Sequence, residues 1–146
     1  MEERYSEDVL KEYPGEGIAV HWEPKLCIHV ANCIRMLPGV FNPEARPWVD
    51  VTGADADAIA EAIEMCPTGA LRYERTDGAP QEAPQTPATV QPRLNGPLFV
   101  RGEVVVVDTQ GNVLREARRM ALCRCGHSEN KPYCDLSHRA AGFRGQ

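Results

Sequence analysis

The sequence predicts an α+β chain of two small domains, a β-α-β unit and a β-rich domain, joined by a Pro-rich linker. Residues 76–97 hold five prolines and almost no large apolar side chains, so this segment cannot bury a core. Strand and helix patterns alternate before it, whereas strand patterns dominate after it. We therefore expect domains at 1–75 and 96–146 with a linker at 76–95. At 146 residues, each domain is short of apolar core and would gain stability from bound metal.

The first domain carries strand patterns at residues 17–22, 46–51 and 70–73. Between the last two, Asp55 is expected to cap a helix that runs to about Met65, with an apolar stripe at helical spacing that includes Ile59 and Ile63. Pro67 ends this helix and leaves Cys66 at its end. Apolar side chains in and near the cysteine loop are expected to be core, namely Trp22, Met36, Leu37, Val40, Phe41 and Trp48.

The second domain carries strand patterns at residues 97–101, 103–107 and 113–121, with a turn at 109–112. The continuous apolar run 104–107 is typical of a strand buried on both faces. A short helix is expected from Asp135, with Asp135 as its N-cap.

Charge and leader patterns restrict the cellular setting. The chain begins without a basic and apolar signal segment and lacks an apolar run of the roughly 20 residues a membrane span needs, so we expect a cytoplasmic protein that binds no membrane. Disulfides are then disfavoured for the six cysteines, and metal ligation is favoured.

Residues 1–75 carry a net charge of −7 and residues 76–146 a net charge of +2. An acidic first half suits a basic protein partner and argues against nucleic acid, although ordinary solubility also explains it.

Four metal-ligating side chains lie within sixteen residues of the second domain: Cys123, Cys125, Cys134 and His138. Thiolate and imidazole are the ligands that zinc and iron–sulfur clusters use. By ligand count alone, a Cys3His zinc site is equally possible. Zinc sites usually separate paired cysteines by two or more residues, and the single-residue gap between Cys123 and Cys125 is unusual there.

The segment from about residue 96 to 143 strongly resembles the mitoNEET-like CDGSH iron–sulfur domain family. The matching positions are Cys123, Cys125, Ser128, Pro132, Cys134, Asp135, Ser137 and His138. The resemblance implies a 2Fe–2S cluster with Cys123 and Cys125 on one iron and Cys134 and His138 on the other. Imidazole ligation should raise the reduction potential and make the cluster sensitive to acid.

Several neighbours of these ligands are expected to support the cluster. Ser128 is a candidate hydrogen-bond donor to a sulfur, and Asp135 belongs to the motif. His127 does not fit the ligand spacing and is expected to be exposed beside the site. Arg124 and Lys131 either offset the cluster's negative charge or are solvated loop charges. Leu136 replaces the motif's glycine; at the first helical turn it is expected to need neither a special backbone angle nor closeness to the cluster, and to shield the cluster from water.

Three further cysteines, Cys27, Cys33 and Cys66, lie in the first domain. Residues from about 17 to 74 resemble the divergent mono-cluster 4Fe–4S ferredoxin domain, on the strings C-I-H-V-A-N-C, L-P-G-V-F, R-P-W-V-D and C-P-T-G-A-L. The resemblance implies a ferredoxin-like fold and a cluster held by these cysteines. Val30 occupies the place of the middle cysteine, so a 3Fe–4S cluster is favoured over 4Fe–4S. His29 as a further ligand and three buried structural cysteines are the alternatives.

These patterns predict a soluble two-cluster iron–sulfur protein that transfers single electrons to or from a redox protein partner. Cluster storage, transfer to an apo acceptor protein, or redox sensing is one alternative, and a structural zinc protein is another. The sequence shows no nucleophile–base pair, phosphate loop or paired acid site, so a catalytic role is not expected. A homodimer is possible by resemblance to CDGSH proteins.

Overall fold

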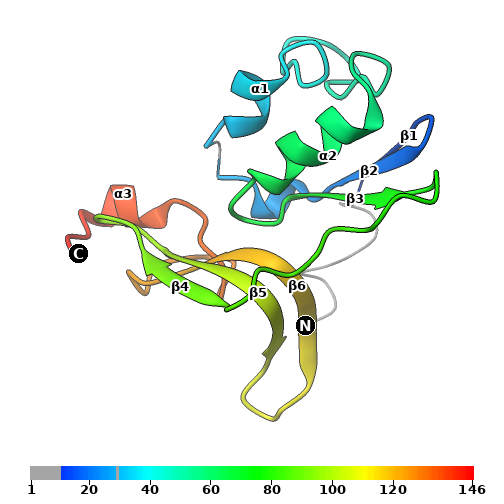
Figure 1. Cartoon of the computed structure of the whole chain (residues 1–146). Coiled ribbons are helices and arrows are strands. Elements are labelled where there is room, and N and C mark those ends of the chain that lie inside the picture. The colour runs from blue at the N-terminus through cyan, green and yellow to red at the C-terminus, as the bar shows by residue number, and fades with distance from the viewer. Residues whose placement is uncertain (1–10, 29) are drawn as a thin grey trace.

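The chain folds into two antiparallel three-stranded sheets in the computed structural model, which describes residues 11–28 and 30–146 (Figure 1). The N-terminal sheet has the order β1-β2-β3, and the C-terminal sheet has the order β4-β5-β6. The strands are β1 (Lys11–Pro14), β2 (Ile18–Trp22), β3 (Leu71–Arg75), β4 (Thr89–Pro92), β5 (Leu98–Val107) and β6 (Val113–Leu122). The helices are η3 (Pro24–Leu26), α1 (Asn32–Met36), α2 (Ala56–Glu64) and α3 (Ser137–Ala141). The predicted α+β class with two small sheet-containing parts is confirmed.

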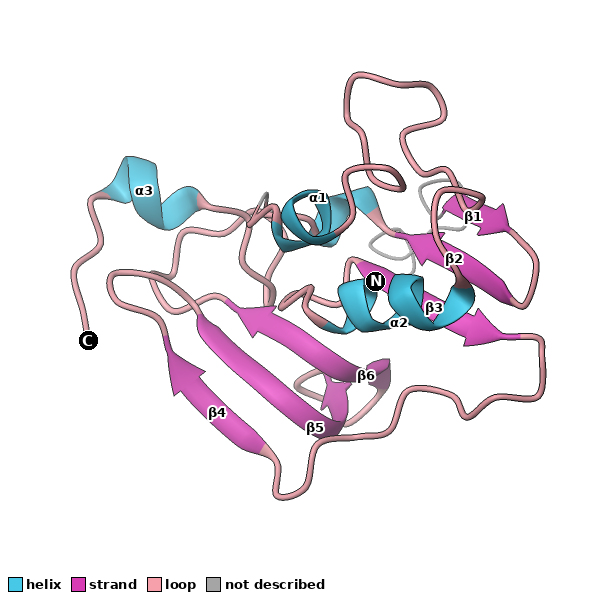
Figure 2. Ribbon diagram, turned by 45° about the horizontal axis from the view of Figure 1, so that its top comes forward, coloured by secondary structure: helices cyan, strands magenta, loops and turns pink. Residues whose placement is uncertain are grey.

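Helix α2 covers the N-terminal sheet and supplies the centre of its core (Figure 2). Its buried side chains Ile59 and Ile63 pack against Ile18 and Val20 of β2 and Leu71 of β3. The helix starts where the sequence predicts, because the Asp55 carboxylate accepts a hydrogen bond from the Ala58 N–H at 2.8 Å. Cys66, which follows the end of α2, also packs against this core.

The predicted strand at residues 46–51 is wrong. Only Val49 pairs there, in an isolated bridge with Phe41. Pro47 has no N–H to donate to a ladder, and Trp48 instead packs against Trp22, with ring centroids 4.8 Å apart. The expectation that Met36 is core is also wrong, because its side chain is exposed.

Strand β5 joins two segments that the sequence predicts as separate strands. A register shift lies between Arg101 and Val104, where Gly102 takes a positive φ of 146° that suits glycine. The predicted burial of residues 104–107 on both faces is wrong, since Val105 and Val107 are half exposed. The β5–β6 hairpin extends beyond β4, which pairs with β5 only from Leu98 to Arg101 (Figure 1).

Part of the segment predicted as linker is structured. Strand β4 lies inside it and pairs with β5. Earlier in the segment, Gln81 hydrogen-bonds to the backbone of Arg75, and the Glu82 carboxylate binds Arg119 of β6. The connection therefore runs along both sheets rather than freely between them. Within residues 11–28 and 30–146, no helix is long and apolar enough to cross a membrane.

Candidate metal centres

The four predicted ligands of the second domain line a single pocket. Cys123 and Cys125 follow the end of β6, Cys134 lies in the loop before α3, and His138 lies in α3. The two ends of the loop are held together by backbone hydrogen bonds from Cys123 N–H to Pro132 at 2.8 Å and from Cys134 N–H to Ala121 at 2.9 Å. Gly96 and Pro97, just before β5, form another part of the pocket wall.

Within this pocket the ligands form two close pairs. The sulfurs of Cys123 and Cys125 are 3.8 Å apart, and the Cys134 sulfur lies 3.7 Å from Nδ1 of His138. The predicted approach of Cys134 and His138 is therefore present. Among the residues that the structure describes, no three or more His, Cys, Asp or Glu side chains meet at the spacing of a single metal ion.

Backbone N–H groups point at the sulfurs. The His127 N–H lies 3.4 Å from the Cys125 sulfur, and the Leu136 N–H lies 3.4 Å from the Cys134 sulfur. Burial alone would raise the pKa of the Cys123 thiol, but hydrogen bonds from the backbone of Ser128 and Gly126, together with hydrogen bonds from Cys125, outweigh it and lower that pKa. Such donors stabilise thiolate, the form that binds iron.

At Cys134 of the second pair the net pKa shift is in the opposite direction, because burial is not outweighed there. Burial raises the pKa of the Cys134 thiol, with a smaller contribution from the carboxylate of Asp135. Burial and the nearby Arg139 lower the pKa of His138, which keeps its imidazole neutral and able to bind metal.

Ser128 and Asp135 shape the loop rather than contacting sulfur with their side chains. The buried Ser128 hydroxyl donates to the Tyr133 carbonyl at 2.5 Å and accepts from the Asn130 N–H. The Asp135 carboxylate accepts from the N–H groups of Glu129 and Ser137. It therefore bridges the loop to the start of α3. The N-cap of α3 lies one residue after Asp135, the predicted N-cap.

That N-cap is Leu136, which adopts the left-handed conformation with φ 73° and ψ 6°. The expectation that this position needs no special backbone angle is wrong: the motif's glycine stands where the chain turns into α3 through a left-handed residue. The Leu136 side chain packs against the buried group of Ile28, Ala121 and Cys134, which agrees with its predicted shielding role.

The remaining neighbours differ in their surroundings. The Arg124 guanidinium donates to the carbonyls of Gly96, Arg93 and Gln146 at 2.7–2.9 Å, so it fastens the C-terminus to the pocket wall. His127 and Lys131 are exposed. Exposure of His127 matches the prediction, and Lys131 lies among the solvated loop charges.

The three cysteines of the first domain line a second, separate pocket. Cys27 directly follows η3, Cys33 lies in α1, and Cys66 follows α2. Helix α1, which the sequence analysis missed, starts after Ala31 in the left-handed conformation, with φ 67°. His29 lies outside the described residues.

Two residues that sequence reasoning did not assign to this site also line it, Trp22 and Thr68. The Thr68 hydroxyl lies 3.6 Å from the Cys66 sulfur and accepts from the Ala70 N–H. The indole Nε1 of Trp22 is buried and has no hydrogen-bond partner among the described residues. A hydroxyl two residues after a cysteine, in C-P-T-G-A-L, was the available signal for Thr68.

This pocket suits a group that brings its own hydrogen-bond acceptors. Its wall is apolar except for the three thiols, Asn32 and Thr68, and it contains an indole N–H that lacks an acceptor. Burial, and then the neighbouring Cys66 thiol, raise the pKa of Cys33 to about 11, so the unloaded site holds a protonated thiol there. A cluster with sulfide sulfurs and positive iron fits both features.

Two pockets are lined by cysteines, one of them also by histidine, and the family models that match the chain make it an iron–sulfur protein. The model of the family described as divergent 4Fe-4S mono-cluster matches residues 13–76, and the model described as iron-binding zinc finger, CDGSH type, matches residues 95–139. The chain belongs to the divergent 4Fe-4S mono-cluster family through its first half and carries a CDGSH-type domain in its second. It is 36% identical over 61 residues to the uncharacterized protein YjdI of Escherichia coli K12, and equally to that of E. coli O157:H7. The match covers 42% of this chain and 80% of either relative.

Proposed function

We propose that this protein is a one-electron carrier with two clusters of different kinds. Cys123, Cys125, Cys134 and His138 would hold a 2Fe–2S cluster. Cys27, Cys33 and Cys66 would hold a 3Fe–4S cluster. When bound, the clusters supply reversible one-electron chemistry, and the chain supplies ligands, N–H donors to sulfur and exclusion of water.

The pairing of ligands in the C-terminal pocket supports the 2Fe–2S assignment. Two pairs, each with atoms less than 4 Å apart, line one pocket, which suits two irons that each take two protein ligands. A single zinc ion needs all four ligands at 2.0–2.3 Å from one point.

The lining of the N-terminal pocket supports three irons rather than four. Besides the three thiols, its described lining residues offer no cysteine, histidine or carboxylate as a fourth ligand, and Val30 is among them. A 3Fe–4S cluster is satisfied by three thiolates. A 4Fe–4S cluster would need a ligand from outside this lining.

The observation that best supports electron transfer is that two such sites occur in one small chain. Redox cycling tests the proposed electron transfer. The protein is purified without oxygen, reduced with dithionite and reoxidised while its visible spectrum is recorded. We expect repeated bleaching and full recovery of colour with iron and sulfide retained. Loss of the clusters on the first cycle, with their appearance in an added apo acceptor, would instead support cluster delivery.

Cluster delivery is the second candidate function, because one edge of the C-terminal site reaches the surface. Gly126 and His127, directly after Cys125, are exposed, whereas Cys134 is buried. Zinc with no sulfide in natively purified protein would contradict both candidates.

A further inference from the structure

The loops that carry Cys27 and Cys134 pack directly against each other. Leu26 and Ile28 flank Cys27 in the chain. Leu26 packs with Ala70 and Tyr133, and Ile28 packs with Ala121 and Cys134 itself. We call these residues the seam: Leu26, Ile28, Ala70, Ala121, Tyr133 and Cys134. Each is at most 5% exposed, so no layer of solvent separates the two loops.

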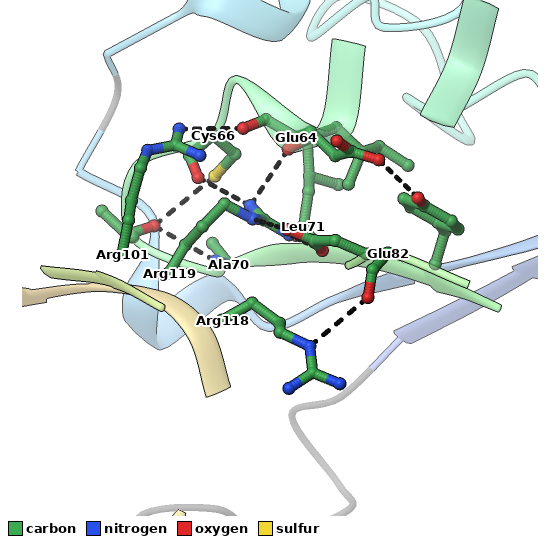
Figure 3. A network of polar contacts seen from close by, with 11 residues as sticks. Glu64, Cys66, Ala70, Leu71, Glu82, Arg101, Arg118 and Arg119 are labelled. Carbon is green, nitrogen blue, oxygen red and sulfur yellow. Dashed lines mark hydrogen bonds and ion pairs between the residues drawn. The ribbon is translucent and has the colours of Figure 1, made fainter. Parts of the chain in front are cut away.

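Arg119 of β6 forms a second bridge between the sites (Figure 3). Its buried guanidinium donates to the carbonyl of Cys66 at 2.6 Å, and to those of Ile63 at 3.0 Å and Leu71 at 2.9 Å. Glu82 balances the charge at 2.8 Å and 3.0 Å. The side chain thus joins the backbone of a cysteine of the first site to the strand that leads to the second.

The backbones also approach closely at this bridge. A Cβ atom on Gly69 would lie 2.4 Å from the Arg119 carbonyl oxygen, so only glycine lets the Cys66 loop lie on β6. From Arg119, β6 runs to Leu122 and Cys123 follows it, four residue steps or about 13 Å at roughly 3.3 Å per residue. Through the seam, one residue step of about 3.8 Å separates Cys27 from Ile28, which belongs to the same buried cluster as Cys134.

We propose that the two cysteine sites exchange an electron with each other inside one chain, across the seam and the Arg119 bridge. The inference rests on the proposed one-electron function. The step moves one electron and neither breaks a bond nor transfers a proton. The electron comes from an external one-electron reductant, and a redox protein removes it from the other site. A dry wall of fixed groups favours this passage, because little solvent has to reorient when charge moves.

The alternative is that each site serves its own external partner and that the packing between them only stabilises the fold. The two views differ in what happens inside an isolated, fully loaded chain. Electron exchange within a chain is first order and independent of protein concentration, whereas exchange between chains scales with it.

The test uses the full-length, fully loaded protein and two kinds of spectra. The protein is first reduced with less than one equivalent of dithionite. Freeze-quenched EPR then follows how the electron redistributes between the sites, at several protein concentrations. EPR relaxation in excess dithionite compares the C-terminal signal of the intact protein with that of Cys33→Ser, which lacks the first cluster. We expect the rate of electron redistribution between the sites to be independent of protein concentration. We also expect the C-terminal signal to relax faster in the intact protein than in Cys33→Ser.

Two variants test the path. Arg119→Met should slow the redistribution of the electron between the sites, whereas Arg118→Met, whose guanidinium donates to the Glu82 backbone carbonyl, should leave its rate unchanged. If Arg119→Met does not fold, Ile28→Ala tests the seam in its place and should slow redistribution.

Two results would overturn the proposal. One is a rate of redistribution proportional to protein concentration, and the other is equal spin relaxation in Cys33→Ser and in intact protein that carries both clusters. Reversible reduction of each site would still support the proposed function in either case. Failure of reversible reduction itself would refute the proposed function first.

Discussion

At the scale of single residues, Leu136 shows how a local departure from a motif is accommodated. A non-glycine residue in the left-handed region costs about 1–2 kcal/mol, and this cost is offset here by packing against Ile28, Ala121 and Cys134. The position therefore combines backbone strain with shelter for the cluster ligands.

We predict that Leu136→Gly changes the free energy of unfolding by less than about 1 kcal/mol, because relief of the backbone and loss of packing nearly cancel. The same change should speed loss of the C-terminal cluster, since the shielding side chain is gone. Urea unfolding and decay of visible absorbance measure the two effects. A slower decay than in the parent protein would contradict the shielding role.

His138 gives the site its sensitivity to acid. Its pKa lies below the ordinary histidine value, so in the unloaded protein the folded state binds this proton less readily than the unfolded chain. As the pH falls through the ordinary pKa of about 6.5, protonation therefore favours both unfolding and loss of the imidazole ligand.

Cluster loss should accelerate below about pH 6, and His138→Cys should slow it, because a thiolate binds iron more tightly than imidazole. Decay of visible absorbance between pH 5 and 8 measures this. Equal decay of both proteins at acid pH would show that another group controls the release.

At the scale of elements, helix α2 connects the core to a cysteine ligand. Its N-cap and apolar stripe fix where it begins and which face it buries, and Cys66 follows at its end. We predict that Asp55→Ala destabilises the protein by about 1 kcal/mol, because the Ala58 N–H loses its acceptor.

Asp57→Ala provides the control for the cap, since Asp57 lies in the same first turn and its carboxylate is exposed where it pairs with Arg75. It should cost less than Asp55→Ala in urea unfolding. Equal costs would mean that general first-turn charge, rather than the cap, stabilises α2.

The same elements show what the sequence could and could not predict. Helix α2 and strands β2, β5 and β6 were predictable because their patterns are local: a cap, a helical stripe or a β-branched run. Strands β1 and β4 carry no such pattern, and they form because a neighbouring strand offers them a ladder. The ligand spacings were local too, whereas the left-handed angle of Leu136 and the buried indole of Trp22 arise from tertiary structure.

At the scale of the whole molecule, the two parts act as one folded unit. Glu23 of the first half is buried and binds Arg72 of its own half and Arg115 of β6. A buried carboxylate shared between two guanidinium groups fixes how the halves meet.

Glu23→Ala should lower the free energy of unfolding by about 3–5 kcal/mol, because it removes the acceptor shared by these arginines. Glu12→Ala, which removes an exposed carboxylate 4.0 Å from His21, should cost at most about 1 kcal/mol. Denaturant unfolding of both variants makes the comparison. A similar small effect for both would contradict a structural role of Glu23 between the halves.

The central claim is that the two cysteine sites hold two different iron–sulfur clusters, and EPR of the oxidised, natively purified protein tests it most directly. We expect the signal of a three-iron centre that disappears in Cys33→Ser and persists in Cys125→Ser. We expect no signal from the C-terminal site until the protein is reduced. An EPR-silent oxidised protein that contains zinc without sulfide, or a three-iron signal that survives Cys33→Ser, would contradict it.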